Sequence, residues 1–114
     1  MVKVLSASDL GSSETASRFE GRDHGSSVSF FWTHHPPGAG VDLHHHPYEE
    51  TFVIQDGAAT FTVDGEQVEA GAGQIVVVPA RAVHGFVNSG DGVLHQVSIH
   101  PCDHVVQEFL DGQG

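Results

Sequence analysis

Apolar and β-branched residues occur along this chain in short runs of four to seven residues, separated by turn-forming residues. Such runs recur roughly every 8–12 residues, and no long stretch has convincing helical periodicity. This spacing is typical of an all-β sandwich or barrel. The pattern predicts strands over residues 28–34, 41–46, 51–54, 58–63, 66–70, 74–78, 83–88 and 93–99.

The residues between and after these runs predict specific local structures. Asp64-Gly65 favours a tight hairpin, because both residues tolerate a positive φ. Pro79 ends the run before it, since proline cannot donate to a strand ladder. Residues 103–110 predict a short C-terminal helix, because four apolar residues recur there at helical spacing: Val105, Val106, Phe109 and Leu110.

Phe30, Phe31 and Trp32 are adjacent in the first strongly apolar run, so successive side chains place apolar groups on both faces of one strand. Either both faces are buried within the domain, or one of them packs against a second subunit. One small barrel does not readily hide so much apolar surface, so we predict a homodimer joined by sheet-to-sheet packing.

The chain has 114 residues, which indicates a single domain. We divide it into an N-terminal arm with edge strands (1–27), a barrel (28–100) and a C-terminal segment (101–114). Cys102 is the only cysteine, so no intramolecular disulfide forms. The first residues lack the apolar run of a signal peptide, and residues 75–78 are far too short to span a bilayer, so we expect a cytoplasmic protein.

The charge of the chain excludes two classes of partner. Four Lys and Arg against fifteen Asp and Glu give a formal net charge of −11. Nucleic acids and anionic membranes both require clustered cations, so neither is an expected partner. The expected partner is a small organic substrate or ligand.

Histidine is over-represented, with ten residues, and three of them are consecutive: His44, His45 and His46. Side chains alternate along a strand, so His44 and His46 share one face, about 6.5–7 Å apart, and can converge on one ion. A bend over residues 47–49 would return Glu50 to the same face as a carboxylate ligand. His84, which follows a Pro-bounded turn at the start of a strand, is the candidate for the fourth ligand.

The residues around these side chains form two motifs. The first is G-x5-H-x-H-x3-E-x6-G, from Gly38 to Gly57, and the second is G-x5-P-x4-H-x3-N, from Gly73 to Asn88. Together they resemble the two motifs of the cupin family, except that Arg81 replaces a usual glycine in the second. A glycine there often supplies a positive φ, which arginine adopts reluctantly.

The resemblance implies an all-β double-stranded β-helix, or jelly-roll barrel. It also implies one divalent transition metal per chain, bound by His44, His46, Glu50 and His84, with His45 as a bystander. Fe, Mn, Ni, Co, Cu and Zn all suit such ligands.

Other histidines are candidates for proton transfer. His95 reaches the cavity if it shares the inner face with Val97 and Ile99, whereas the opposite orientation places Leu94, Gln96 and Ser98 inside. The first arrangement is favoured because its residues are more apolar. His34 and His35 are similar candidates for contact with a substrate. We assign the candidate catalytic role to His95 and His34. His100, Cys102 and His104 have the spacing of a second metal site, but an ordinary terminal loop is the favoured interpretation.

The resemblance covers dioxygenases, oxalate-degrading enzymes, sugar isomerases, polyketide cyclases and non-catalytic binding modules, and a shared fold does not select among them. We expect a metal-dependent enzyme with dioxygenase-like, isomerase-like or cyclase-like chemistry. The alternative is a non-catalytic module that binds or senses a small ligand through the same metal.

Overall fold

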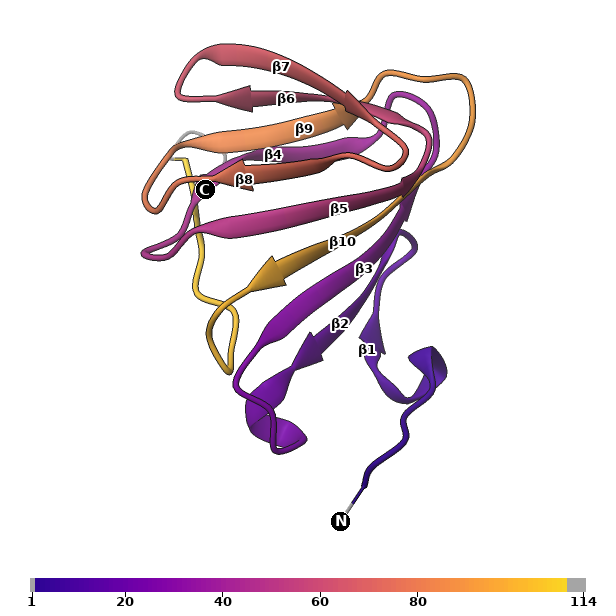
Figure 1. Ribbon diagram of the computed structural model, residues 1–114, viewed down its shortest axis with the longest axis vertical. Helices are drawn as coiled ribbons and strands as arrows, with labels where there is room; N and C mark the ends of the chain where they lie inside the picture. The colour runs from indigo at the N-terminus through magenta and orange to yellow at the C-terminus, as the bar shows by residue number, and fades with distance from the viewer. Residues whose placement is uncertain (1, 111–114) are drawn as a thin grey trace.

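A computed structural model describes residues 2–110, which form two antiparallel β-sheets (Figure 1). The six-stranded sheet has the order β1-β2-β3-β10-β5-β8, and the five-stranded sheet has the order β11-β4-β9-β6-β7. The strands are β1 (Gly11–Ser12), β2 (Ala16–Glu20), β3 (Ser29–His35), β4 (Gly40–His45), β5 (Glu50–Asp56), β6 (Ala58–Val63), β7 (Glu66–Gly71), β8 (Ile75–Val78), β9 (His84–Asn88), β10 (Leu94–His100) and β11 (Glu108–Phe109). Two single-turn 3₁₀ helices, Ala7–Asp9 and Gly21–Asp23, precede β3.

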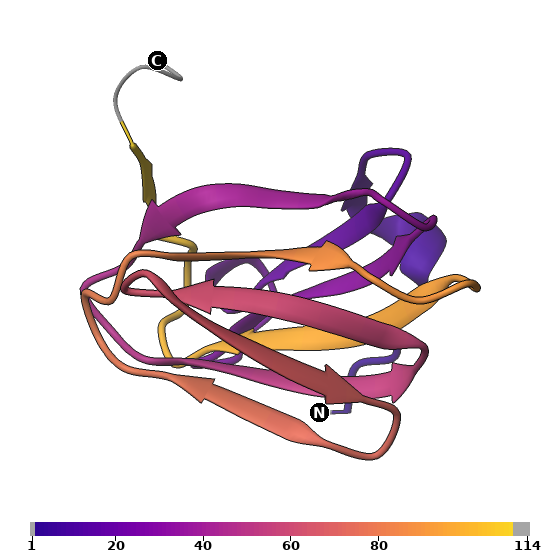
Figure 2. The ribbon, with the colours of Figure 1, turned by 90° about the horizontal axis from the view of Figure 1, so that it is seen from above.

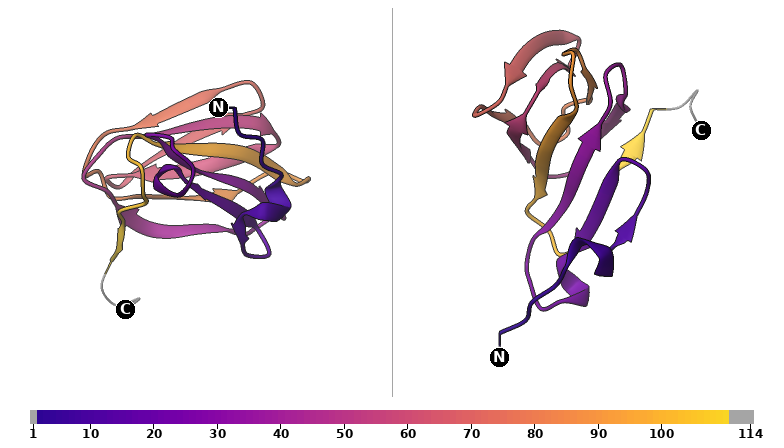
Figure 3. Two further views of the ribbon diagram at one scale, coloured as in Figure 1. Left: turned by 90° about the horizontal axis from the view of Figure 1, so that it is seen from below. Right: turned by 90° about the vertical axis from the view of Figure 1, so that its right-hand side faces the viewer.

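The two sheets face each other, and the hydrophobic core lies between them (Figures 2 and 3). Alternation along each strand directs one set of side chains inward. Aromatic rings from both sheets meet in the core, where the ring centroids of Phe52 on β5 and Phe61 on β6 are 4.9 Å apart. The expected all-β jelly-roll barrel is confirmed. None of the helices among the described residues is long and apolar enough to cross a membrane.

The hairpin predicted at Asp64-Gly65 joins β6 to β7. Both residues have a positive φ, of 48° and 84° respectively. This is the combination required by a two-residue hairpin turn whose twist matches its strands. Arg81 also has a positive φ, of 67°, so the chain keeps the backbone geometry that glycine normally provides at this position of the motif.

The C-terminal helix predicted over residues 103–110 is wrong, because residues 103–104 form a bend and the chain then runs without helix into β11. Glu108 and Phe109 pair with His45 and His44 of β4. Earlier in the segment, the Val105 N–H donates to Glu20 Oε2 over 2.9 Å. A helix of eight residues is marginal in water, whereas the extended chain gains partners for its backbone and a ring contact for Phe109.

The aromatic run on β3 divides between the two faces of the sheet. Phe31 faces the interior, where it lines a cavity. On the other face, Phe30 stacks on Phe19 of the adjacent β2, with ring centroids 4.7 Å apart, and Trp32 remains 47% exposed. The expected apolar groups on both faces of this strand are therefore present.

Candidate metal centre

Four side chains converge at one end of the barrel: His44 from β4, His46 just after it, Glu50 from the start of β5 and His84 from the start of β9. All four are at most 4% exposed. Each offers one ligand atom, and these four atoms lie within 4.8 Å of one another. His45 points away from them, and its Nε2 lies 3.7 Å from Glu108 Oε2.

The backbone fixes the orientation of all three imidazoles. The Nδ1 atoms of His44, His46 and His84 lie 2.8, 2.9 and 2.8 Å from the carbonyl oxygens of Asp42, Val106 and Ala82. A carbonyl can only accept, so each Nδ1 carries a hydrogen and donates it. In the neutral imidazole, the lone pair is then on Nε2, the atom that faces the centre of the site.

This arrangement fits a divalent metal ion. His46 Nε2 and His84 Nε2 lie 2.9 and 2.8 Å from the same oxygen, Glu50 Oε1. If both imidazoles are neutral, their lone pairs face a carboxylate lone pair, which is unfavourable. Either protons or a cation must lie between these atoms, and three imidazole nitrogens with one carboxylate are a suitable donor set for a divalent transition metal.

At this site, burial and neighbouring charges shift the pKa values in opposite directions. Burial lowers the pKa of His44 to about 4. Burial also opposes the charged form of His84, but the Glu50 carboxylate outweighs it and raises the pKa of His84. Burial raises the pKa of Glu50, but the close approach of His100 and the hydrogen bonds with His46 and His84 outweigh it and hold that pKa below its usual range.

His100 is a fifth member of this cluster that the sequence analysis did not assign. Its side chain is fully buried, and its Nε2 lies 3.1 Å from Glu50 Oε2. On its other side, Nδ1 is 2.7 Å from the Tyr48 hydroxyl, which accepts a hydrogen bond from the Val106 N–H over 3.0 Å. The hydroxyl has one hydrogen to donate; with Nδ1 as its acceptor, Nε2 carries the ring hydrogen and lies at ion-pair distance from Glu50 Oε2 without forming a hydrogen bond to it. In this tautomer His100 supports the carboxylate and is not itself a ligand.

His95 and His34 do not lie in this site. They pair with each other across β10 and β3 on the exposed outer face of the sheet. The expectation that His95, Val97 and Ile99 face the cavity is wrong, because Leu94, Gln96, Ser98 and His100 are the buried set. Val97 and Ile99 instead pair with Trp32 and Phe30 of β3. The outer face is itself apolar there, so hydrophobicity does not identify the inner one.

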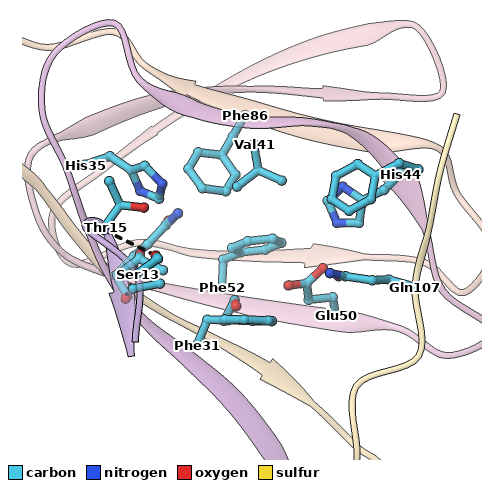
Figure 4. Close-up of a pocket in the computed structure, with 15 residues that line it drawn as sticks. Ser13, Thr15, Phe31, His35, Val41, His44, Glu50, Phe52, Phe86 and Gln107 are labelled. Carbon is cyan, nitrogen blue, oxygen red and sulfur yellow. Dashed lines mark hydrogen bonds between the residues drawn. The ribbon is translucent and has the colours of Figure 1, made fainter. Parts of the chain in front are cut away.

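A cavity of about 210 Å³ adjoins the four-residue cluster (Figure 4). His44 and Glu50 form part of its wall at one end. Its remaining walls are aromatic or aliphatic (Phe31, Val41, Phe52, Phe86 and Phe109, with Ala16) and uncharged polar (Ser13, Thr15, Thr33, Gln96, Ser98 and Gln107), together with His35.

Cys102, Asp103 and His104 form a second group of neighbouring donors. His104 Nδ1 lies 2.7 Å from Asp103 Oδ1 and 3.8 Å from Cys102 Sγ. Asp103 is exposed, and His100, the first residue of the spacing that suggested a metal site, points into the barrel. This group lies in a terminal loop.

Comparison with known proteins supports the resemblance. A 56-residue segment is 38% identical to "Polyketide synthase CurC" of Streptomyces cyaneus, and it covers 48% of this chain and 36% of that protein. Among solved structures, one point mutant of Bacillus subtilis oxalate decarboxylase superposes with a TM-score of 0.76 at 27% identity, over 87% of this chain and 29% of that one. A second point mutant of the same enzyme gives a TM-score of 0.77 at 26% identity, over 89% and 29%. A study of that decarboxylase describes its Mn(II) centres.

The chain thus spans about a third of the length of the proteins it matches. The profile of the Cupin domain family matches residues 31–100, which include both motifs and all five members of the buried cluster. With more than half of its length matched, the chain belongs to the cupin family.

Proposed function

We propose that this cupin is a metal-dependent enzyme that acts on a small organic molecule. It would hold one divalent transition metal through His44, His46, Glu50 and His84. The observation that carries the proposal is the convergence of three oriented Nε2 atoms and one buried carboxylate beside a cavity. A bound ion would supply Lewis-acid chemistry at the positions that the protein ligands leave open.

The residues around the ion have distinct roles in this proposal. His100 and Tyr48 hold the Glu50 carboxylate in place, and the carbonyls of Asp42, Val106 and Ala82 hold the three imidazoles. The aromatic walls exclude water from the reacting molecule, which strengthens electrostatic interactions within the cavity.

We assign proton transfer to His35 and not to His95 or His34. Within the described residues, His35 is the one titratable side chain in the cavity wall besides His44 and Glu50. Burial, together with the neighbouring His34, lowers its pKa, so the imidazole is neutral at pH 7 and can accept a proton.

A non-catalytic binding module is the second candidate, and the composition of the cavity wall favours it. Apart from His35 and the two proposed metal ligands His44 and Glu50, no titratable side chain lines the wall among the residues that the structure describes; Asp, Lys, Arg, Tyr and Cys are all absent from it. Few groups are therefore available for acid–base catalysis, and a ligand could bind beside the metal without reacting.

The composition of the cavity wall also limits the charge that a substrate can carry. The metal ion of the proposed site would balance an anionic group bound directly to it, whereas an anionic group farther along the cavity would need cationic side chains around it. Within residues 2–110, neither Lys nor Arg lines this cavity, and Phe31, Phe52 and Phe86 form much of its wall. We therefore infer that the part of the substrate that lies away from the metal is uncharged and unsaturated.

The test combines metal content with a search for turnover. Protein purified without a chelating resin should contain one metal ion per chain. His84→Ala should lose most of it, and His45→Ala, the matched control in the triplet, should retain it. Equal losses would refute the assigned ligand set.

Oxygen consumption and substrate loss over a panel of small enols, diketones and flavonols would then separate the two candidates, since a binding module shows saturable binding without turnover.

The homodimer stays a prediction. Trp32 on the outer face of β3 is the residue expected to lie in the interface, since it is 47% exposed in the single chain. Light scattering at high micromolar concentration should give twice the mass of one chain, and Trp32→Glu should give the monomer mass. A monomeric wild-type protein would contradict this prediction.

A further inference from the structure

The cavity has two polar ends separated by an aromatic middle. Figure 4 shows His44 and Glu50 at one end, His35 and Thr15 at the other, and Phe52, Phe86 and Val41 between them. The metal centre accounts for the first end. Apart from His35, the proposed proton carrier, the residues at the second end have no role in the proposed metal site.

Gln96 supplies the clearest signal at the second end. It lies on β10 with its side chain directed inward, and it is fully buried. Neither its Nε2 nor its Oε1 has a hydrogen-bond partner within residues 2–110. Leaving a buried amide unpaired costs on the order of 1–3 kcal/mol, so such groups are normally paired with protein, water or a ligand.

His35 is a second buried polar group without a partner. It is 3% exposed, and its Nδ1 makes no hydrogen bond to the described residues. In the register of β3 and β10, Gln96 is opposite Thr33 and Leu94 is opposite His35. Gln96 and His35 are therefore diagonal neighbours on the inner face, which are about 7–8 Å apart between backbones. Thr33 does not satisfy the amide, since its hydroxyl donates to the Gln96 carbonyl oxygen of the main chain.

The pair offers donors and acceptors but no net charge. A carboxamide provides two hydrogens and one acceptor oxygen, and a neutral imidazole provides one of each. The other polar groups in this part of the wall, Thr15 and Ser13, are hydroxyls. A carboxylate, phosphate or ammonium group would be left without a counter-charge here, whereas a ketone or hydroxyl group would find matching partners.

We propose that Gln96 and His35 form a recognition subsite for an uncharged oxygen substituent, a ketone or a hydroxyl, on a planar ligand whose opposite end lies at the metal centre. This inference rests on the proposed function, because it identifies the ligand class of the same cavity. The rings of Phe31, Phe52 and Phe86 contact the body of the ligand.

The dimensions limit the size of that ligand. Gln96 and His100 are four residues apart on β10, which is about 13 Å along a strand. The volume of about 210 Å³ is below the 300–1,000 Å³ typical of sites for drug-sized molecules. The ligand is therefore an elongated molecule of one or two fused rings with polar groups at opposite ends.

Three probes of one shape test the subsite: naphthalene, 2-naphthol and 2-naphthoate, titrated against Zn(II)-loaded and metal-free protein by naphthyl fluorescence. Wild-type protein should bind 2-naphthol roughly three- to tenfold more tightly than naphthalene, as expected for one net hydrogen bond. The metal-free protein should bind 2-naphthoate more weakly than 2-naphthol. Gln96→Leu should reduce the preference for 2-naphthol to less than about twofold.

Gln107→Leu is the matched control, because Gln107 lines the opposite, metal end of the same cavity. It should leave the preference unchanged. Gln96→Leu should also melt at the same temperature as wild type or higher, since it removes an unpaired buried amide. If this variant does not fold, Gln96→Met provides the same test.

Two results would overturn the subsite. One is a preference for 2-naphthol that survives in Gln96→Leu but disappears when the metal is removed, because the hydroxyl would then bind at the metal. The other is tighter binding of 2-naphthoate than of 2-naphthol by the metal-free protein. A chain that binds no metal but retains the Gln96-dependent preference would refute the proposed metal enzyme and leave the subsite standing.

Discussion

Asn88, the last residue of the second motif, is expected to stabilise the barrel through three hydrogen bonds. The side chain is 2% exposed. Its Nδ2 donates to the carbonyl oxygens of His35 and Gly92 over 2.9 and 2.8 Å, and its Oδ1 accepts from the Gly90 N–H over 2.9 Å. Asn88→Ala would leave two carbonyls and one N–H without these partners.

The magnitude follows from those contacts. Three hydrogen bonds at about 1 kcal/mol each give a loss of about 3 kcal/mol in the free energy of unfolding. For 114 residues, the entropy of unfolding is about 0.24 kcal/mol per kelvin, so Tm should fall by about 12 °C. Thermal melts followed by far-UV circular dichroism measure this shift directly.

Two further variants separate the hydrogen bonds from other effects. Asn88→Asp keeps the shape but removes both donors and places a carboxylate against two carbonyls, so it should destabilise at least as much as alanine. Ser89→Ala is the control, since Ser89 is an exposed neighbour and its loss should cost less than about 0.5 kcal/mol. A loss below about 1 kcal/mol in Asn88→Ala would refute the reasoning.

Three more predictions concern the metal end and the turn beside it. In the metal-free protein, the pKa of His44 is about 4, against an ordinary value of 6.5, so between these two pH values the unfolded chain binds a proton that the folded chain does not. About 3 kcal/mol of the free energy of unfolding should therefore be lost as the pH falls from 6.5 to 4. Urea titrations should show that His44→Gln reduces this dependence of stability on pH. Arg81→Gly should raise Tm by up to about 4 °C, because it relieves a positive φ that costs an L-residue roughly 1 kcal/mol; a lower Tm would contradict this. His100→Ala should weaken metal binding by about 10- to 100-fold in chelator competition, and Tyr48→Phe should weaken it less, whereas unchanged affinity in both would remove the supporting role of His100.

Much of the metal end could be predicted because it depends on local geometry. The alternation of a strand places His44 and His46 together whatever surrounds them, and the structure has them on one side with His45 on the other. The hairpin at Asp64-Gly65 is equally local, since its two residues determine the turn. Neither inference requires knowledge of what the strand packs against.

The features that could not be predicted depend on tertiary contacts. The cavity decides which face of β10 points inward. Gln96 and Ser98 line the cavity, whereas Val97 lies on the outer face. The usual rule that apolar residues face inward therefore gave the wrong orientation. The same error concealed His100, whose distance from Glu50 in the sequence gives no sign of their 3.1 Å contact. The extended C-terminal segment likewise depends on partners in β4 and on Glu20.

That C-terminal segment has a consequence for access to the metal end of the cavity. Phe109 and Gln107 form part of the cavity wall, and Phe109 lies 5.0 Å from the His44 ring. They belong to a segment attached to β4 through a two-residue pairing and through the Leu110 N–H, which donates to the Leu43 carbonyl over 3.2 Å. Detaching it costs about 2 kcal/mol, so roughly 3% of molecules would be open at any moment while the rest of the barrel stays closed. Local detachment of this segment would then expose the metal end of the cavity without any motion of the barrel.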